Sequence, residues 1–364
     1  MSEIHVDPKF TQLKHNYQEK QYQDSSVYKG ELLTDQRHGQ GIYFYNNGDT
    51  YFGQWQNDLF HGEGAYIFST GERYEGQLIQ GKKNGQGRYT YTNGNYYEGS
   101  WVNDKKEGYG VYHYITNNEK YEGNWVAGQK SGQGKYTFAY GDIYDGTWEK
   151  NLKHGFGKLI YSSGAVFEGE WSHDKVVRNG IMKYSNGDIY NGGFEDGKKN
   201  GQGVYQHNDG NVYEGEWRND EKNGHGVMKF NNGDIFEGYF VDGLRSGKGS
   251  YKYINGDSYE GNWKADKKFN HGTLIMATGD VYNGEWFEGR KNGRGKYSFA
   301  NQDQYDGNFY RGLRQGQGTY TWSDGSHYEG EWKEDRMHGR GKYVAQDGKM
   351  VEGYFEKDNF VSGF

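Results

Sequence analysis

The stretch YEGEWRNDEKNGHGVMKFNNGDI, residues 213–235, mixes strand-forming aromatic residues with glycines. Gly224 and Gly226 lie close to Tyr213 and Trp217 in this short segment. Aromatic side chains favour β-strands, whereas a glycine weakens a strand interior by about 0.5–1 kcal/mol relative to alanine. The stretch therefore raises the question of what the glycines contribute.

The same pattern recurs along the chain with a period of 23 residues, which is the signature of a repeat architecture. When the leading aromatic residue is position 0, position 2 is always glycine, position 4 is aromatic or leucine, and positions 11 and 13 usually form a Gly-x-Gly pair. The unit that begins at Tyr97 has one extra residue. The units begin at Tyr28, Tyr51, Tyr74, Tyr97, Tyr121, Tyr144, Phe167, Tyr190, Tyr213, Phe236, Tyr259, Tyr282, Tyr305, Tyr328 and Val351.

The spacing within a unit predicts two short strands. Positions 0, 2 and 4, and then 11, 13, 15 and 17, follow the two-residue period of a β-strand. Position 7 is Asp, Asn or Gly in every unit, which favours a tight turn between the strands. Signals such as Asn232-Gly233-Asp234 separate the repeats. Because position 17 and the next position 0 must share a face, we expect a three-residue loop with a left-handed glycine.

This pattern also predicts a register between neighbouring strands. It places position 4 between glycine 11 of its own repeat and glycine 13 of the previous one, so that Trp217 would lie between Gly224 and Gly203. A single-layer sheet has no second layer to close its core. Aromatic rings laid over bare glycine backbone would each bury about 150–250 Å² without one.

The pattern Y-x-G-x-W-x-x-D/G-x-x-x-G-x-G-x-Y-x-Y-x-x-G resembles the membrane occupation and recognition nexus (MORN) repeat over residues 28–364. Arg178 and Asn270 depart from it at the first Gly of the pair, and Asn117 and Gln302 at the turn Gly. The resemblance implies an all-β fold, an elongated, single-layer, twisted antiparallel sheet of about fifteen stacked β-hairpins. It also implies a family whose members are mostly scaffolds, with a history of phospholipid binding.

The repeats predict one quasi-linear domain over residues 28–364, with fourteen full repeats and one truncated repeat, in which each repeat contacts only its neighbours. A composition of 32% hydrophobic residues argues against a large compact core. Residues 1–27 lie outside the repeat. Residues 16–22 either add one capping strand, because Asp24-Ser25-Ser26 matches the turn between repeats, or belong to a disordered tail.

The search for catalytic, cofactor and metal sites is negative, and we expect no enzyme. The Gly-x-Gly pairs lack the Gly-Lys-Ser/Thr and the strand-to-helix context of a phosphate loop. There is no cysteine, no long apolar run and no signal region, so we expect neither secretion nor a membrane span, and a cytoplasmic location. Carboxylate pairs such as Glu214 and Glu216 recur with the repeat on the face opposite the rings. This recurrence is typical of a solvent-exposed row and not of a catalytic acid–base pair.

Charge separates the classes of partner. A net charge of −7 opposes general attraction to nucleic acid or to anionic membranes. Pairs of lysines at positions 8 and 9 are expected to form a basic edge, which could contact anionic lipid headgroups or acidic proteins, or prevent edge-to-edge aggregation. The pairs are Lys82 and Lys83, Lys105 and Lys106, Lys198 and Lys199, and Lys267 and Lys268.

Three phenylalanines are candidate contact residues. Phe269 is an unusual apolar residue in a turn, and Phe360 and Phe364 belong to the truncated last unit. An unpaired strand edge favours association, so we predict a homodimer formed through the C-terminal repeats. The sequence thus predicts a non-enzymatic, rod-like scaffold or adaptor for protein–protein interactions, and the resemblance adds a cytoskeletal or ciliary/axonemal assembly. The alternative is a peripheral phospholipid-binding adaptor that links membrane to cytoskeleton.

Overall fold

The computed structural model describes residue 8 and residues 17–363. In residues 17–363 all the regular elements that it defines are β-strands, and all their pairings are antiparallel. The chain divides into two units, residues 1–185 and 186–364. The all-β, antiparallel, single-layer fold class predicted from the sequence is confirmed.

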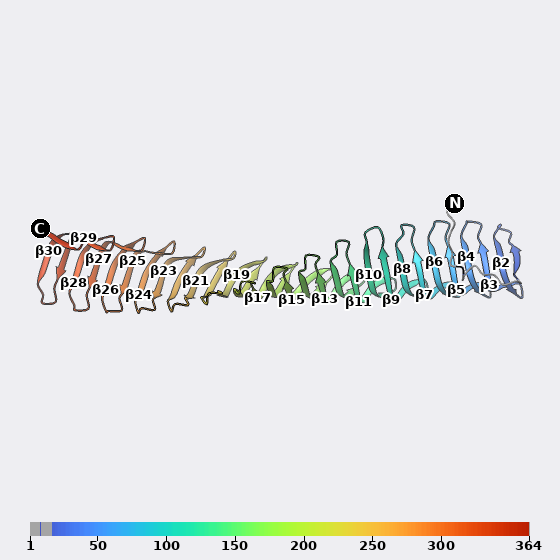
Figure 1. The fold of residues 1–364 in the computed structure, drawn as a ribbon, viewed down its shortest axis with the longest axis horizontal. Coiled ribbons are helices and arrows are strands. Elements are labelled where there is room, and N and C mark those ends of the chain that lie inside the picture. The colour runs from blue at the N-terminus through green and yellow to red at the C-terminus, as the bar shows by residue number, and fades with distance from the viewer. Residues whose placement is uncertain (1–7, 9–16, 364) are drawn as a thin grey trace. The chain divides into compact units, whose positions relative to one another are not determined.

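The strand bounds follow the repeats in both units (Figure 1). In the described residues, unit 1 contains β1 (Gln18–Gln21), β2 (Val27–Leu33), β3 (Gln36–Phe44), β4 (Thr50–Gln56), β5 (Leu59–Ile67), β6 (Arg73–Ile79), β7 (Lys82–Thr90), β8 (Tyr96–Val102), β9 (Lys105–Tyr114), β10 (Glu119–Val126), β11 (Gln129–Thr137), β12 (Ile143–Glu149), β13 (Leu152–Ile160), β14 (Val166–Ser172) and β15 (Lys175–Lys183). Unit 2 contains β16 (Ile189–Glu195), β17 (Lys198–Gln206), β18 (Val212–Arg218), β19 (Glu221–Lys229), β20 (Ile235–Val241), β21 (Leu244–Lys252), β22 (Ser258–Lys264), β23 (Lys267–Ile275), β24 (Val281–Phe287), β25 (Arg290–Ser298), β26 (Gln304–Tyr310), β27 (Leu313–Thr321), β28 (His327–Lys333), β29 (Arg336–Val344), β30 (Met350–Glu356) and β31 (Asn359–Gly363).

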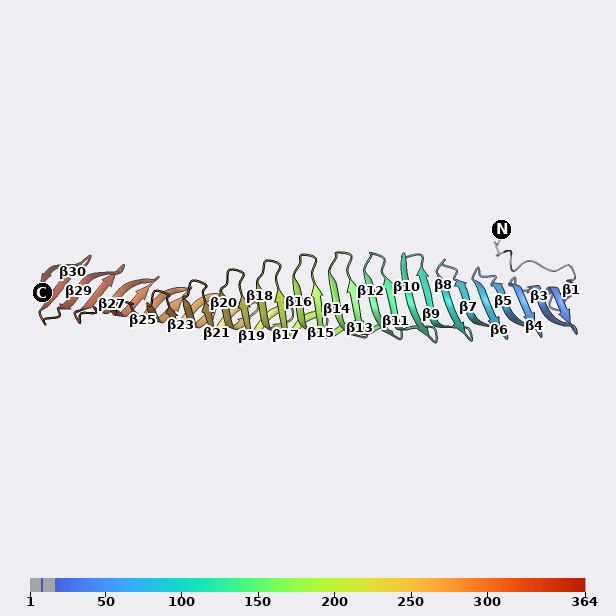
Figure 2. The same cartoon turned by 60° about the horizontal axis from the view of Figure 1, so that its bottom comes forward.

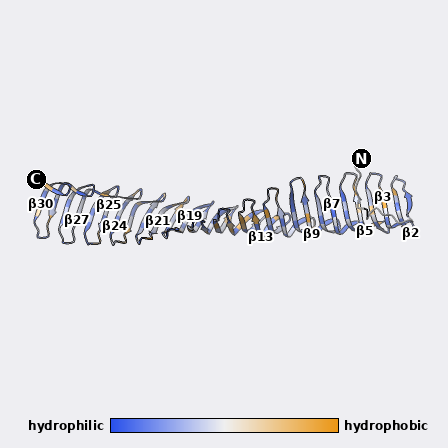
Figure 3. Cartoon of the chain, in the orientation of Figure 1, coloured by the Kyte–Doolittle hydropathy of each residue, from blue (hydrophilic) through white to orange (hydrophobic). Residues whose placement is uncertain are grey.

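Within each unit, every strand pairs with the next strand along the chain, so the sheet is a stack of hairpins (Figure 2). Hydrophobic residues are scattered among hydrophilic ones along the strands (Figure 3). Before the first repeat, β1 pairs with β2, and the turn between them has the hydrogen bonds of the later inter-repeat loops. Within this segment the structure places a strand at Gln18–Gln21.

The two kinds of turn have different geometry. Asn219 and Asp220 join β18 to β19 with φ values of 50° and 73°, which defines a two-residue hairpin turn of type I′. Between repeats, the Phe230 amide donates to Asp234 O and the Gly233 amide donates to Phe230 O, both at 2.9 Å. Gly233 has a φ of 93°. The predicted three-residue loop with a left-handed glycine is confirmed.

The core is a row of aromatic rings on one face of the sheet. Tyr213 at position 0 is completely buried, and its hydroxyl donates to Glu216 O at 3.0 Å. The ring of Trp217 meets it edge-on, with ring centres 5.3 Å apart, and Phe240 of the next repeat does so at 5.0 Å. Edge-to-face pairs of this kind add about 0.5–1.5 kcal/mol each beyond area burial. Stacked repeats thus complete each other's core.

The predicted register of Trp217 is wrong by two residues on each side. Trp217 lies opposite Lys222 in its own repeat and opposite Gly201 in the previous one. On the side of its own repeat the cause is a β-bulge, which shifts the register between Gly215 and Trp217. On the side of the previous repeat the strands pair without a bulge, and the closure of the three-residue loop sets the register. The indole still reaches the predicted glycine backbone of the previous repeat, because Trp217 Nε1 donates to Gly203 O at 3.2 Å.

The two glycines of the Gly-x-Gly pair have different functions. A Cβ atom on Gly226 would lie 2.5 Å from Tyr213 Oη, so this glycine makes room for the position-0 ring. Gly224 has a φ of 99° at the bulge, and the nearest side chain is that of Glu216, whose Oε1 accepts the His225 amide at 3.0 Å. Asn270, in place of this first glycine, keeps a left-handed φ of 56°. The first glycine of the pair therefore provides the left-handed backbone conformation of the bulge, and the second makes room for the position-0 ring.

Candidate interaction surfaces

The aromatic side of the sheet carries a second regular feature. Position 9 lies on this side among the rings of positions 0, 4, 15 and 17, and we call this surface the ring face. Position 9 is Lys or Arg in eleven of the fourteen full repeats, and each of these cations lies 4.3–5.1 Å from the centre of its nearest ring. The residues are Arg37, Lys83, Lys106, Lys130, Lys153, Lys199, Lys222, Arg245, Lys268, Lys291 and Arg314.

Lys106 shows how such a cation is enclosed. Its Nζ lies 5.0 Å from the centre of the Tyr97 ring and 4.4 Å from that of Tyr112, both in its own repeat. The third wall is Trp125 of the next repeat, at 4.8 Å. The negative faces of aromatic rings attract a cation, by about 2 kcal/mol where it is desolvated. The lysines therefore join consecutive repeats.

This enclosure changes the acid–base properties of the lysines. Burial lowers the pKa of Lys106 to about 8, and the neighbouring Lys83 ammonium lowers it further. Burial also lowers the pKa of Lys130 and of Lys268 to about 8, although nearby carboxylates oppose the change. Desolvation penalises the charged form of an amine. These side chains therefore titrate close to physiological pH.

The turn residue at position 7 fixes the backbone beside each cation. The Lys83 amide donates to Asp104 Oδ1 of the next repeat at 2.9 Å. Arg37 adds its guanidinium to the same kind of contact, because both its amide and its Nε donate to Asp58 Oδ1 at 2.9 Å. In the next repeat after Lys106, position 7 is Gly128, whose amide donates to Lys106 O at 2.9 Å.

The lysine pairs predicted to form one basic edge are divided between two faces. Successive side chains of a strand point to opposite sides, and both members of each pair lie at the start of a strand. The position-8 lysines Lys82, Lys105, Lys198 and Lys267 are exposed. The position-9 lysines Lys83, Lys106, Lys199 and Lys268 are half-buried in the ring face. The cations among the rings were not predicted from the sequence, although the recurrence of Lys or Arg at position 9 could have indicated them.

The three candidate phenylalanines differ in their surroundings. Phe269 lies in strand β23 and not in a turn, as was predicted from the sequence, because the turn ends at Asp266. It is half-buried, with its ring centre 6.1 Å from that of Phe287 and 5.1 Å from Lys264 Nζ. Phe360 is exposed, and its ring centre lies 5.5 Å from that of Phe355. Phe364 lies outside the described residues.

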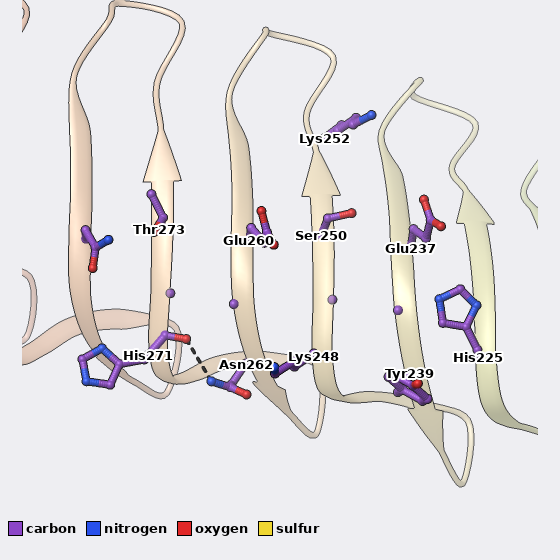
Figure 4. A pocket seen from close by; sticks show the side chains of 15 residues that line it. His225, Glu237, Tyr239, Lys248, Ser250, Lys252, Glu260, Asn262, His271 and Thr273 are labelled. Carbon is purple, nitrogen blue, oxygen red and sulfur yellow. Dashed lines mark hydrogen bonds between the residues drawn. The ribbon is translucent and has the colours of Figure 1, made fainter.

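The opposite side of the sheet, which we call the polar face, has an open groove of about 880 Å³ in unit 2 (Figure 4). Bare glycine backbone forms its floor, between one row of side chains that includes Glu260 and Thr273 and another that includes His225, Tyr239 and Lys248. The groove mixes acidic, basic and neutral groups. In the part of the chain that the structure describes, no group of three or more His, Asp or Glu residues could hold a metal ion.

The same described residues include no helix that is long and apolar enough to cross a membrane.

The Asp residues that follow the turn glycine have a structural function. Asp234 accepts the Tyr251 hydroxyl at 2.8 Å and the Ile254 amide at 2.9 Å, and these hydrogen bonds hold the pKa of its carboxyl group below the usual value. They connect one inter-repeat loop to the next.

The chain belongs to the MORN repeat family, as the repeat pattern and the hairpin stack indicate. The family model matches fourteen tandem segments, and one residue separates the fourth segment from the fifth, where the 24-residue unit lies. The segments are residues 28–50, 51–73, 74–96, 97–119, 121–143, 144–166, 167–189, 190–212, 213–235, 236–258, 259–281, 282–304, 305–327 and 328–350. No curated protein matches the chain significantly.

Solved structures with similarity to the chain include two forms of the TCP10 domain of Danio rerio CPAP. The E1021V mutant is 12% identical with a TM-score of 0.29, and the match covers 61% of this chain and 99% of that domain. The wild-type domain is 11% identical with a TM-score of 0.25, over 60% and 92%. Virginiamycin B lyase from Staphylococcus aureus is 12% identical with a TM-score of 0.13, over 91% and 89%.

Proposed function

We propose that this chain is a non-enzymatic scaffold or adaptor that binds other proteins, and that the ring face is its main binding surface. The cytoskeletal or ciliary setting and the cytoplasmic location are parts of the same proposal. The observation that carries it is the ring face itself: rings at positions 15 and 17, such as Tyr112 and Tyr114, are only half-buried and alternate with cations. Protein interfaces are enriched in aromatic residues and arginine.

Site-specific photocrosslinking tests this proposal. Tyr114 lies on the ring face, whereas Tyr109 lies in the same strand, β9, on the polar face and is 59% exposed. A photoreactive phenylalanine at position 114 should form crosslinks to a defined set of cytoskeletal or ciliary proteins in cell extract. The matched replacement at position 109 should not. Equal crosslinking from both positions, or none from position 114, would contradict the ring face as binding surface.

The second candidate function is a phospholipid-binding adaptor, and the exposed position-8 lysines favour it. Lys82 and Lys105 lie on successive hairpins, and each residue of this kind contributes about 1 kcal/mol near an anionic surface. Flotation with anionic liposomes at physiological salt tests it. Binding that Lys82→Glu and Lys105→Glu abolish would support a lipid adaptor, whereas binding that appears only at low salt would be diffuse charge attraction.

We also propose a homodimer through the C-terminal repeats. Strand β31 pairs with β30 and is exposed along its length. Exposed strand edges template association, and a two-fold arrangement is the commonest closed symmetry. Light scattering should show a dimer for the full chain and a monomer for a chain that ends at Lys349. The same state for both chains would exclude this contact.

A further inference from the structure

We infer that the ring face of unit 1 binds an acidic, proline-rich peptide in the polyproline II conformation, which crosses strands β6 to β13 with one peptide turn per repeat. The inference rests on the proposed function and names the chemistry of its partner. Three features carry it: the repeat distance, the half-buried rings and the row of cations at position 9.

The repeat distance matches one regular peptide conformation. Neighbouring strands lie about 4.7–4.9 Å apart, so a two-strand repeat advances by about 9.4–9.8 Å. A polyproline II helix has three residues per turn and rises 3.1 Å per residue, about 9.3 Å per turn. Every third residue of such a peptide therefore meets the same position of the next repeat, with an accumulated offset of about 1 Å over three repeats. An extended strand repeats its side-chain direction after about 6.6–6.8 Å, and an α-helix turns every 5.4 Å, so neither stays in phase.

The rings supply the surface that proline recognises. A recess of about 310 Å³ opens on the ring face between Lys83 and Lys106, and Tyr89, Tyr91 and Trp101 are among its walls. Tyr89 and Tyr91 are half-buried, with ring centres 4.7 Å apart. Proline-rich segments dock in aromatic-lined grooves because their conformation is already formed before binding. This recess would hold one turn of peptide.

The row of position-9 cations indicates both that the peptide is acidic and how long it is. Lys83, Lys106, Lys130 and Lys153 form an unbroken run in four consecutive repeats, each cation within 5 Å of a ring centre. A phenylalanine, Phe60, precedes the run at position 9, and Val176 follows it. Four repeats correspond to a peptide of about twelve residues with an acidic residue at every third position.

Lys106 has the least compensating negative charge in this run. In the flanking repeats, Asp104 accepts the Lys83 amide and Asp174 accepts the Lys153 amide, both at 2.9 Å. The equivalent turn positions beside Lys106 and Lys130 are Gly128 and Asn151. Asn95 similarly stands where Asp49 and Asp188 contact the hydroxyl of a position-15 tyrosine in other repeats. In this run the ring face is therefore most cationic at Lys106, although the whole chain is acidic. Beside Lys130, in contrast, Glu119 accepts the Tyr136 hydroxyl at 2.8 Å.

Calorimetric titration of the full chain with synthetic peptides tests the inference. The peptide (Pro-Pro-Glu)4 should bind at least tenfold more tightly than (Pro-Pro-Lys)4. It should also bind more tightly than a peptide of the same composition in which the Glu residues are two and four positions apart. Equal affinity for the acidic and basic peptides, or no effect of spacing, would overturn the inference.

Two matched pairs of variants locate the peptide on the ring face. Lys106→Met should weaken (Pro-Pro-Glu)4 about tenfold, as expected for the loss of one close charge pair, whereas Lys105→Met on the polar face should not. Gly128→Asp introduces a carboxylate beside Lys106 at a position with open space for a side chain, so it weakens binding without disturbing the fold. Its control is Gly81→Asp, at the equivalent open position beside Phe60. Equal affinities within either pair of variants would contradict the inference.

The experiments distinguish failure of the peptide inference from failure of the proposed scaffold function. If no proline-rich peptide binds but photocrosslinks still form from position 114, the inference is overturned and the scaffold function stands. If neither occurs, both are overturned. Binding of anionic vesicles or an acidic helical peptide that depends on Lys106, without binding of (Pro-Pro-Glu)4, also overturns the inference.

Discussion

Replacing Gly226 with alanine should destabilise its hairpin by about 3 kcal/mol. A Cβ atom there would lie 2.5 Å from Tyr213 Oη and 2.6 Å from Cε2 and Cζ of the same ring, all closer than van der Waals contact. The ring cannot move aside easily, because it is completely buried and Trp217 and Phe240 pack against it edge-on. The cost lies between ordinary overpacking, about 1–3 kcal/mol, and loss of a buried aromatic side chain, about 3–5 kcal/mol.

The matched substitution is Gly224→Asn, in the same Gly-x-Gly pair. Gly224 has a φ of 99° at the bulge, and Asn270 already occupies the equivalent position with a φ of 56°. Its nearest side chain is the end of Glu216, which can rotate away. Only the left-handed backbone then opposes the substitution, at about 1 kcal/mol.

Urea unfolding followed by tryptophan fluorescence measures the two losses, and hydrogen exchange over β18 to β20 shows whether they are local. Asn270→Gly is a control that should change the free energy of unfolding by less than about 0.5 kcal/mol. An equal or larger loss for Gly224→Asn than for Gly226→Ala would refute the assignment of ring space to one glycine and bulge conformation to the other.

Three further predictions concern charge and hydrogen bonding. Because burial lowers the folded-state pKa of Lys106 and Lys130 to about 8 from an ordinary 10.5, the unfolded chain binds more protons above pH 8, and the free energy of unfolding should rise from pH 8 to 10. Urea titrations at several pH values should show this rise up to about pH 10. Above pH 10 the buried tyrosines, whose pKa is raised, should lower the free energy of unfolding again. A steady decline from pH 8 to 10 would contradict the prediction. Asp234→Ala should cost about 1–2 kcal/mol in urea unfolding, since it removes the acceptor of the Tyr251 hydroxyl and of a backbone amide; an unchanged midpoint would exclude this function. Gly128→Asp should leave the melting temperature within about 1 °C, because a Cβ atom there meets no neighbour and Asp occupies this turn position in other repeats; a larger fall would contradict it.

The sequence alone determined the repeat, its strands and its turns, because these depend on local chemistry. The two-residue alternation fixes which side chains share a face, and the Asn-Gly-Asp signals fix the loop between repeats. Gly233 takes the left-handed conformation that this loop length requires. Each inference used only interactions among residues close in sequence, and the same local rules apply in every repeat.

The tertiary structure decided the register inside each hairpin. The bulge places one residue of β18, Glu216, opposite three residues of β19, 223–225. A shift of two residues preserves the alternation of buried and exposed positions, so this alternation alone permits more than one partner for Trp217. The choice depends on contacts across strands: Glu216 accepts the amide beside the bulge, and Tyr213 covers Gly226. The sequence pattern contains both glycines but does not state which one makes room for a ring.

The candidate site was determined in the same two stages. The sequence shows that lysines follow the turn in pairs such as Lys105 and Lys106, and this suggested a single basic edge. The structure places Lys105 in solvent and encloses Lys106 between Tyr112 of its own repeat and Trp125 of the next. That enclosure requires two repeats in contact, and the resulting loss of water, which lowers the lysine pKa, is a property of the stacked hairpins and not of either repeat alone.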